Sequence, residues 1–100
     1  MTMISIRRTA EFLKFVRDLR DARASVKIAR RIDRLEQGNP GDVKAIGEGV
    51  SEMRIDYGPG YRIYFCHRGA FLVILLCGGD KKNQEADIKL AKKLAREVEI

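Results

Sequence analysis

The sequence is poor in the residue types that build metal centres and disulfide frameworks. Its 100 residues include one histidine, two cysteines and no tryptophan. Cys66 and Cys77 stand in apolar stretches without Cys-x-x-Cys or Cys/His ligand spacing. His67 cannot complete a zinc site with them by any usual pattern. The sequence also contains no cluster of acidic residues of the kind that a metal nuclease uses. We therefore expect no metal and no cofactor.

Two further absences concern the cellular compartment. No apolar segment follows Met1, so we expect no signal peptide. The longest apolar run, Ala70 to Cys77, is too short to span a bilayer. Two reduced thiols in apolar surroundings suit the cytosol. These features predict a cytoplasmic protein with no membrane partner.

Positive charge, in contrast, is abundant and unevenly spread. Lys and Arg number 20 against 14 Asp and Glu, a formal net charge of +6. Residues 1–41 hold ten of the basic and five of the acidic side chains, so half of the cations lie in this first segment. This balance favours a polyanionic partner, such as nucleic acid, an anionic membrane surface or an acidic protein. The length predicts a single domain over residues 1–100.

Two helices are predicted in the first half, after a short strand at 3–6. Thr9 is a favourable N-cap for the first helix, whose apolar residues recur at helical spacing: Phe12, Val16 and Leu19. The second helix runs from about Ala22 to Gln37 and ends at Gly38-Asn39-Pro40-Gly41. Its apolar stripe is Ile28, Ile32 and Leu35. We expect the two helices to form an antiparallel pair on a sheet.

The second half changes to the alternation of strands. Strands are predicted at 50–56, 61–66 and 71–77, separated by turns at 57–60 and 67–69. The run at 71–77 is apolar on both faces, which indicates an interior strand. Asn83 is expected to cap a last helix, whose apolar stripe is Ile88, Ala91, Ala95 and Val98.

Alternation also limits how the first hairpin pairs. Met53 must share a face with Ile63, which requires a loop of odd length. Either Arg54 or Asp56 then lies opposite Arg62. Both registers gather four side chains into one polar patch on the sheet: Glu52, Arg54, Arg62 and Tyr64.

The patch contains the residues best suited to chemistry. Two mid-strand arginines fit phosphate binding, because a guanidinium contacts two phosphate oxygens at once; the alternative is ion pairing with Glu52 and Asp56. Glu52 could deprotonate a ribose hydroxyl, although holding the arginines is the favoured role. For Tyr64, base stacking and packing are equally expected. Because Arg62 lies on a surface face, we expect its truncation to leave folding intact.

Two lysines, Lys81 and Lys82, follow the glycine pair at 78–79. Glycines allow close approach of a ligand, so Lys81 in particular is a candidate phosphate ligand, the alternative being a solvated loop before a helix. His67 stands in a turn, where a plain surface role is favoured over catalysis.

Two stretches carry a family resemblance: residues 47–65, which contain Gly-Pro-Gly-Tyr-Arg, and residues 75–88, which contain Gly-Gly-Asp-Lys. Together they resemble the RelE/ParE superfamily of toxin–antitoxin toxins, in its HigB-like "addiction module killer protein" branch. The resemblance covers nearly the whole chain. It implies an α+β fold in which a small curved antiparallel sheet packs against an N-terminal helical hairpin, with a C-terminal helix.

The resemblance also implies metal-independent cleavage of mRNA in the ribosomal decoding site. The catalytic set it implies is Arg62, Lys81 and, if one hairpin residue is inserted here, Arg54. To this set we add Glu52. The family's acid and base groups have no clear match, and Asp80, Lys82 and Asp87 stand nearby. We assign Lys82, Tyr64 and Asp80 to RNA binding.

The implied partners are a cognate antitoxin of helix-turn-helix type, the ribosome and mRNA, with operator DNA reached only through the antitoxin. One alternative is the ParE branch, which shares the fold and inhibits DNA gyrase without being an enzyme. Another is a nucleic-acid-binding module that acts with its antitoxin. A gyrase inhibitor would need no convergent phosphate site, so the polar patch favours the nuclease.

Overall fold

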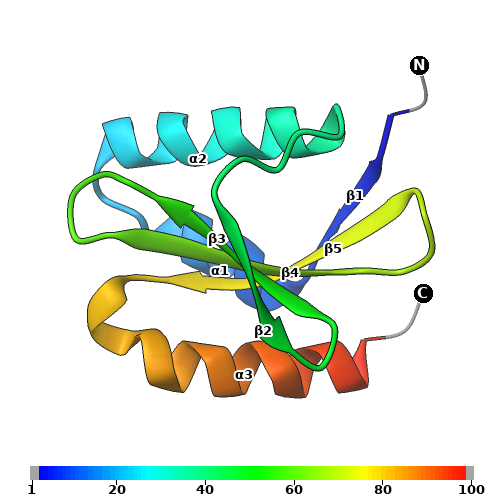
Figure 1. Cartoon of the computed structure of the whole chain (residues 1–100). Coiled ribbons are helices and arrows are strands. Elements are labelled where there is room, and N and C mark those ends of the chain that lie inside the picture. Colours follow the sequence, from blue (N-terminus) through cyan, green and yellow to red (C-terminus); the bar gives the residue numbers. More distant parts are fainter. Residues whose placement is uncertain (1–2, 99–100) are drawn as a thin grey trace.

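The computed structural model describes residues 3–98, which form a five-stranded sheet between two helical layers (Figure 1). In chain order the elements are β1 (Ser5–Arg8), α1 (Ala10–Asp18), α2 (Ala22–Glu36), β2 (Val43–Gly47), β3 (Val50–Ile55), β4 (Tyr61–His67), β5 (Leu72–Gly79), the 3-10 helix η1 (Lys81–Asn83) and α3 (Gln84–Glu97). The strand order is β1-β5-β4-β3-β2. The predicted α+β class is confirmed.

Three local predictions need correction. The strand β2 was not predicted, because its partly buried residues Val43 and Ile46 are three positions apart and a register shift between Ala45 and Gly47 interrupts the alternation. The sheet is not wholly antiparallel, since β1 pairs with β5 in parallel. Asn83 makes no capping hydrogen bond; instead Asp80 caps η1 by accepting from the Asn83 backbone N–H at 3.1 Å.

Other local predictions are confirmed. The Thr9 side chain caps α1 by accepting from the Phe12 N–H at 3.0 Å. In the β3–β4 hairpin Arg54 lies opposite Arg62, which leaves an odd loop of residues 56–60. The second helix ends at Glu36, before the predicted Gly-Asn-Pro-Gly break. Strand β5 lies inside the sheet, between β1 and β4.

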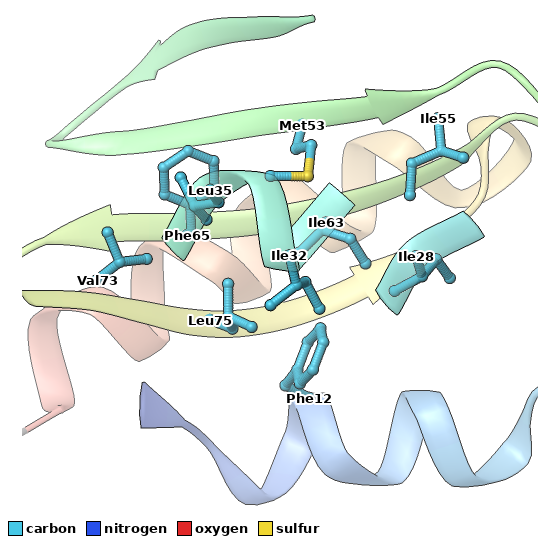
Figure 2. Packing of buried hydrophobic residues seen from close by; sticks show 10 residues of the cluster. All are labelled: Phe12, Ile28, Ile32, Leu35, Met53, Ile55, Ile63, Phe65, Val73 and Leu75. Atoms are coloured by element: carbon cyan, nitrogen blue, oxygen red, sulfur yellow. The ribbon is translucent and has the colours of Figure 1, made fainter. Parts of the chain in front are cut away.

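The main core fills the space between α1, α2 and the sheet (Figure 2). Phe12 from α1 and the predicted α2 stripe meet alternate residues of β3, β4 and β5, among them Met53, Ile63 and Leu75. All are buried, and each such side chain stabilises the fold by about 1.5–3 kcal/mol.

The opposite face of the sheet is covered by α3 (Figure 1). Ala91 and Ala95 pack on Val50, Tyr64 and Cys66. A register shift between β4 and β5 lets the neighbours Leu76 and Cys77 both contribute to this second core. Across residues 3–98, none of the helices has the length and apolar character that crossing a membrane requires.

Helix α1 approaches β5 closely at Gly78. A Cβ atom at this position would lie 2.4 Å from the Phe15 ring. We predict that Gly78→Ala lowers the free energy of unfolding by about 1–3 kcal/mol through overpacking, measured by denaturant unfolding. In a Phe15→Leu background the same change should cost less. An equal loss in both backgrounds would contradict this contact as the cause.

Candidate phosphate-binding site

Three of the four predicted catalytic side chains converge at the end of the β3–β4 hairpin. Arg54, Arg62 and Lys81 line one groove of about 440 Å³, together with Asp42, Ile55, Asp56 and Gly60. The paired strands place the two arginines side by side. The Lys81 backbone N–H donates to Pro59 O at 3.4 Å, which brings η1 against the hairpin loop. We call this the hairpin groove.

Arg62 is the most constrained of the three cations. Its side chain is 12% exposed, and its Nε lies 3.5 Å from Glu52 Oε2. Its Nη1 donates to Gly60 O at 2.7 Å. Within residues 3–98 no hydrogen bond uses Nη2, and the buried Nε has no hydrogen-bond partner, so its contact with Glu52 is an ion pair only. The guanidinium is therefore fixed at one edge and keeps donor capacity for an anion in the groove.

Glu52 lies beneath α3 and not on an open face. It is 1% exposed, and its Oε2 accepts from the Tyr64 hydroxyl at 3.2 Å and from Gln84 Nε2 at 2.8 Å. The prediction that Glu52 and Tyr64 belong to an exposed patch is thus wrong, because α3 covers them. Tyr64, at 0% exposure, cannot stack on a base in this structure; burial is the first cause that raises its pKa, followed by the Glu52 charge.

Arg54 has a different partner from the two that the sequence offered. Its Nη2 lies 2.8 Å from Asp42 Oδ1, and both side chains are well exposed. This hydrogen bond and the Asp42 charge raise the pKa of Arg54. A solvent-exposed pair of this kind contributes little to stability, so an incoming phosphate can replace the carboxylate at small cost.

The remaining predicted residues take separate positions. Lys81 is exposed and, within residues 3–98, makes no ion pair. Asp80 Oδ1 accepts from the backbone and side chain of Asn83, which holds η1 in place. Lys82 is exposed but does not line the hairpin groove. His67 lies at the far end of β4 beside Phe65, and the groove does not include it.

Sequence reasoning missed the neighbours Asp42 and Gln84 and did not place Asp87. Asp42 precedes β2, so without that strand nothing placed it beside Arg54. Gln84 contacts Glu52, and Asp87 lies against Gly79, because α3 folds over the sheet. Within residues 3–98, no three His, Cys, Asp or Glu side chains gather as a metal-binding group.

Asp87 sits in an unfavourable electrostatic environment. Its Oδ2 is buried, has no hydrogen-bond partner among residues 3–98, and lies 1.8 Å from where a Cβ at Gly79 would stand. Burial raises the pKa of this carboxyl group, and the nearby charge of Asp80 adds to the effect. Burial likewise raises the pKa of the adjacent Cys77 thiol to about 12, so this thiol stays protonated at neutral pH.

The buried carboxylate of Glu52 yields a stability prediction with a matched control. Glu52→Gln leaves Arg62 without its counter-charge, so the free energy of unfolding should fall by roughly 3 kcal/mol. Glu48→Gln breaks an exposed pair with Arg96 (2.8 Å) and should cost about 1 kcal/mol or less. Thermal and denaturant unfolding measure both. Equal losses would show that burial of the Glu52–Arg62 pair is energetically irrelevant.

Asp87 yields a prediction of pH dependence. Because its folded-state pKa is raised, the folded chain binds the proton more tightly than the unfolded chain, and ionisation weakens the fold as pH rises above about 3.9. The stability of Asp87→Asn relative to the natural chain should therefore increase between pH 3 and pH 7. Exposed Asp56→Asn serves as the control. A relative stability of Asp87→Asn that falls over this range would contradict the assignment.

Comparison with known proteins gives a family and a fold. Residues 14–98 match the family described as "Phage derived protein Gp49-like (DUF891)". An uncharacterized protein of Haemophilus influenzae (strain ATCC 51907 / DSM 11121 / KW20 / Rd) is 50% identical over 95 residues, which are 95% of this chain and 96% of that protein.

The solved structure of a mutant E. coli toxin RelE in the free state is similar to this chain, with a TM-score of 0.70. The match covers 91% of this chain and 97% of that one, at 16% sequence identity. At such low identity the likeness shows the fold alone, which is RelE-like. With most of its length matched by the family, the chain belongs to the phage-derived Gp49-like family, DUF891.

Proposed function

We propose that this chain is the toxin of a type II toxin–antitoxin system, of the HigB-like branch, and that it cleaves mRNA on the ribosome without a metal ion. One observation carries the proposal: Arg54, Arg62 and Lys81 converge in a single groove on a RelE-like fold. Three cations around one hollow favour a phosphate that gains negative charge during a reaction.

The chemistry would be an in-line displacement at phosphorus. The ribose 2′-oxygen forms a bond to the adjacent phosphorus atom while the bond to the 5′-oxygen of the next nucleotide breaks. The 2′-hydroxyl gives up a proton and the departing 5′-oxygen gains one. Arg62, fixed by Glu52 and Gly60, stabilises the charge on the phosphate. Arg54, once released from Asp42, also binds the phosphate. Lys81 contributes a third, mobile positive charge.

Glu52 takes a positioning role in this proposal. With three partners and 1% exposure, it orients Arg62 and is screened from the 2′-hydroxyl. The solvent-exposed titratable side chains of the groove are Asp42, Asp56 and Lys81, and these are the groups available to carry protons. Lys82 contributes a further RNA contact outside the groove, while Asp80 holds Lys81 in place.

The partners follow from the same proposal. The chain would act in the cytoplasm on ribosome-bound mRNA and be silenced by a cognate helix-turn-helix antitoxin. Operator DNA would be reached only through that antitoxin. Expression of the chain alone should then arrest growth.

A ParE-like inhibitor of DNA gyrase is the rival function on this fold, and a plain nucleic-acid-binding module is another. The hairpin groove favours the nuclease over the gyrase inhibitor, because an inhibitor that binds gyrase needs no convergent set of phosphate-binding cations. A cell-free extract separates the candidates. Cut mRNA supports the nuclease, broken DNA with intact translation supports the gyrase inhibitor, and RNA binding without either supports the module.

We predict that Arg54→Ala slows single-turnover cleavage on programmed ribosomes by about 10²–10³-fold, the scale of losing one donor that stabilises the transition state. Its melting temperature should barely move, because its ion pair is exposed.

Arg62→Ala should slow cleavage similarly but also destabilise the fold, since it leaves the buried Glu52 charge without its partner. This corrects the expectation that its folding would be unaffected. Arg62→Lys should restore stability and part of the rate.

Exposed Arg20→Ala is the matched control and should cut at the natural rate. Naked RNA should remain nearly uncut, and EDTA should act only through damage to the ribosomes. The proposal fails if free RNA is cut efficiently only with added metal, or if Arg54→Ala and Arg62→Lys both cut at the natural rate.

A further inference from the structure

Helix α2 carries a second concentration of cations that the hairpin groove does not use. Lys27, Arg30 and Arg34 recur at helical spacing and are exposed. Within residues 3–98, none of the three forms an ion pair. Unpaired cations on one helix face repel one another, so this arrangement is more typical of an anion-binding surface than of a stabilising one.

These cations line a groove of their own, about 210 Å³ in volume, between α2 and the end of β3. Its lining is Lys27, Arg30, Arg31, Arg34, Ile55 and Asp56. Arg31 is committed to the fold, because its guanidinium donates to the carbonyls of Pro40, Asp42 and Arg54. The other three keep their charges for a ligand. We call this the α2 groove.

The α2 groove and the hairpin groove are neighbours. Both are lined by Ile55 and Asp56, at the point where β3 ends and the hairpin loop begins. The two hollows therefore meet at one rim, although α2 covers one face of the sheet and η1 follows β5 near the other (Figure 1). A polyanion bound in the hairpin groove can continue into the α2 groove.

We propose that the α2 groove binds RNA phosphates next to the reacting one, so that the two grooves form one continuous RNA-binding surface. The inference rests on the proposed function, because it takes the hairpin groove as the site of the reacting phosphate. From Lys27 to Arg34 the helix rises about 10 Å, so its cations can face more than one phosphate of a bound strand.

RNA fits this surface better than an acidic protein does. The α2 groove offers four basic side chains, one carboxylate and the single apolar residue Ile55. The centre of a protein–protein interface is apolar and depleted of charge, whereas phosphate binding needs only cations. Asp56, exposed on the shared rim, opposes a phosphate there, so Asp56→Asn should tighten RNA binding.

The test measures binding without cleavage. The probes are a trinucleotide and a dodecanucleotide of 2′-O-methyl RNA, which lacks the attacking hydroxyl group. The variant is Lys27→Gln/Arg30→Gln/Arg34→Gln. The matched control, Arg7→Gln/Lys89→Gln/Lys93→Gln, removes the same charge from exposed positions elsewhere. Because Lys27 also lies over the Tyr57 ring at 5.3 Å, the double variant Arg30→Gln/Arg34→Gln repeats the test with that contact intact.

For the triple variant and the dodecanucleotide, the slope of log affinity against log salt concentration should become shallower by about two, at about 0.7 for each of the three lost contacts. Trinucleotide binding should change little, and the control should resemble the natural chain. Unchanged binding of the dodecanucleotide with weakened binding to ribosomes would overturn the continuous surface, because the α2 cations would then contact ribosomal RNA and not the strand that is cut. The proposal is also overturned if the triple variant binds free RNA and ribosomes as tightly as the natural chain. It is overturned as well if the control variant loses as much RNA affinity, or if only binding of an acidic protein is weakened.

This failure is distinguishable from failure of the proposed function. A natural chain that binds the dodecanucleotide with the steeper slope but never cuts mRNA on ribosomes would refute the nuclease and retain the α2 groove. A triple variant that keeps the natural slope and the natural cutting rate would refute the α2 groove alone.

Discussion

The structure around the hairpin groove depends on one buried carboxylate. An ionised group at 1% exposure is costly unless it is paired and hydrogen-bonded. Glu52 on β3 takes partners from two other elements, Arg62 and Tyr64 on β4 and Gln84 on α3. Satisfying this one group therefore requires the first turn of α3 to lie over the β3–β4 hairpin. It also fixes which edge of the Arg62 guanidinium faces inward.

The close seating of α3 has its own structural requirements. Ala91 and Ala95 let the helix backbone approach the sheet, and Gly79 leaves the space that the Asp87 carboxylate occupies. The register shift before Gly78 turns both Leu76 and Cys77 toward α3 and then presents Gly78 to Phe15 of α1. The end of β5 thus packs against helices on both faces, and the chain that leaves it, η1, delivers Lys81 to the groove.

Local patterns predicted the parts of this arrangement that depend on neighbours in sequence. Alternation around Met53 and Ile63 was enough to assign the faces of β3 and β4 and to limit their register to two choices. It could not predict that α3 covers the polar face, because an amphipathic stripe shows which side of a helix is buried but not against what. The pairing of Arg54 with Asp42 was missed for a different reason, since Asp42 precedes a strand whose alternation is interrupted by a register shift.

The hairpin loop connects the two halves of the basic surface. On one side the Tyr57 hydroxyl donates to Asp21, the N-cap of α2, at 2.8 Å, and this hydrogen bond lowers the pKa of that carboxyl group. On the other side Pro59 O accepts from the Lys81 backbone. A loop anchored at both ends fixes the backbone of the two strand ends that carry Arg54 and Arg62, between the cations of α2 and those of η1. Only the Arg62 guanidinium, held by Glu52 and Gly60, is preorganised for an anion. In the proposed function, the surplus of positive charge in the first segment of the chain would therefore act beside a site built mainly from the second half.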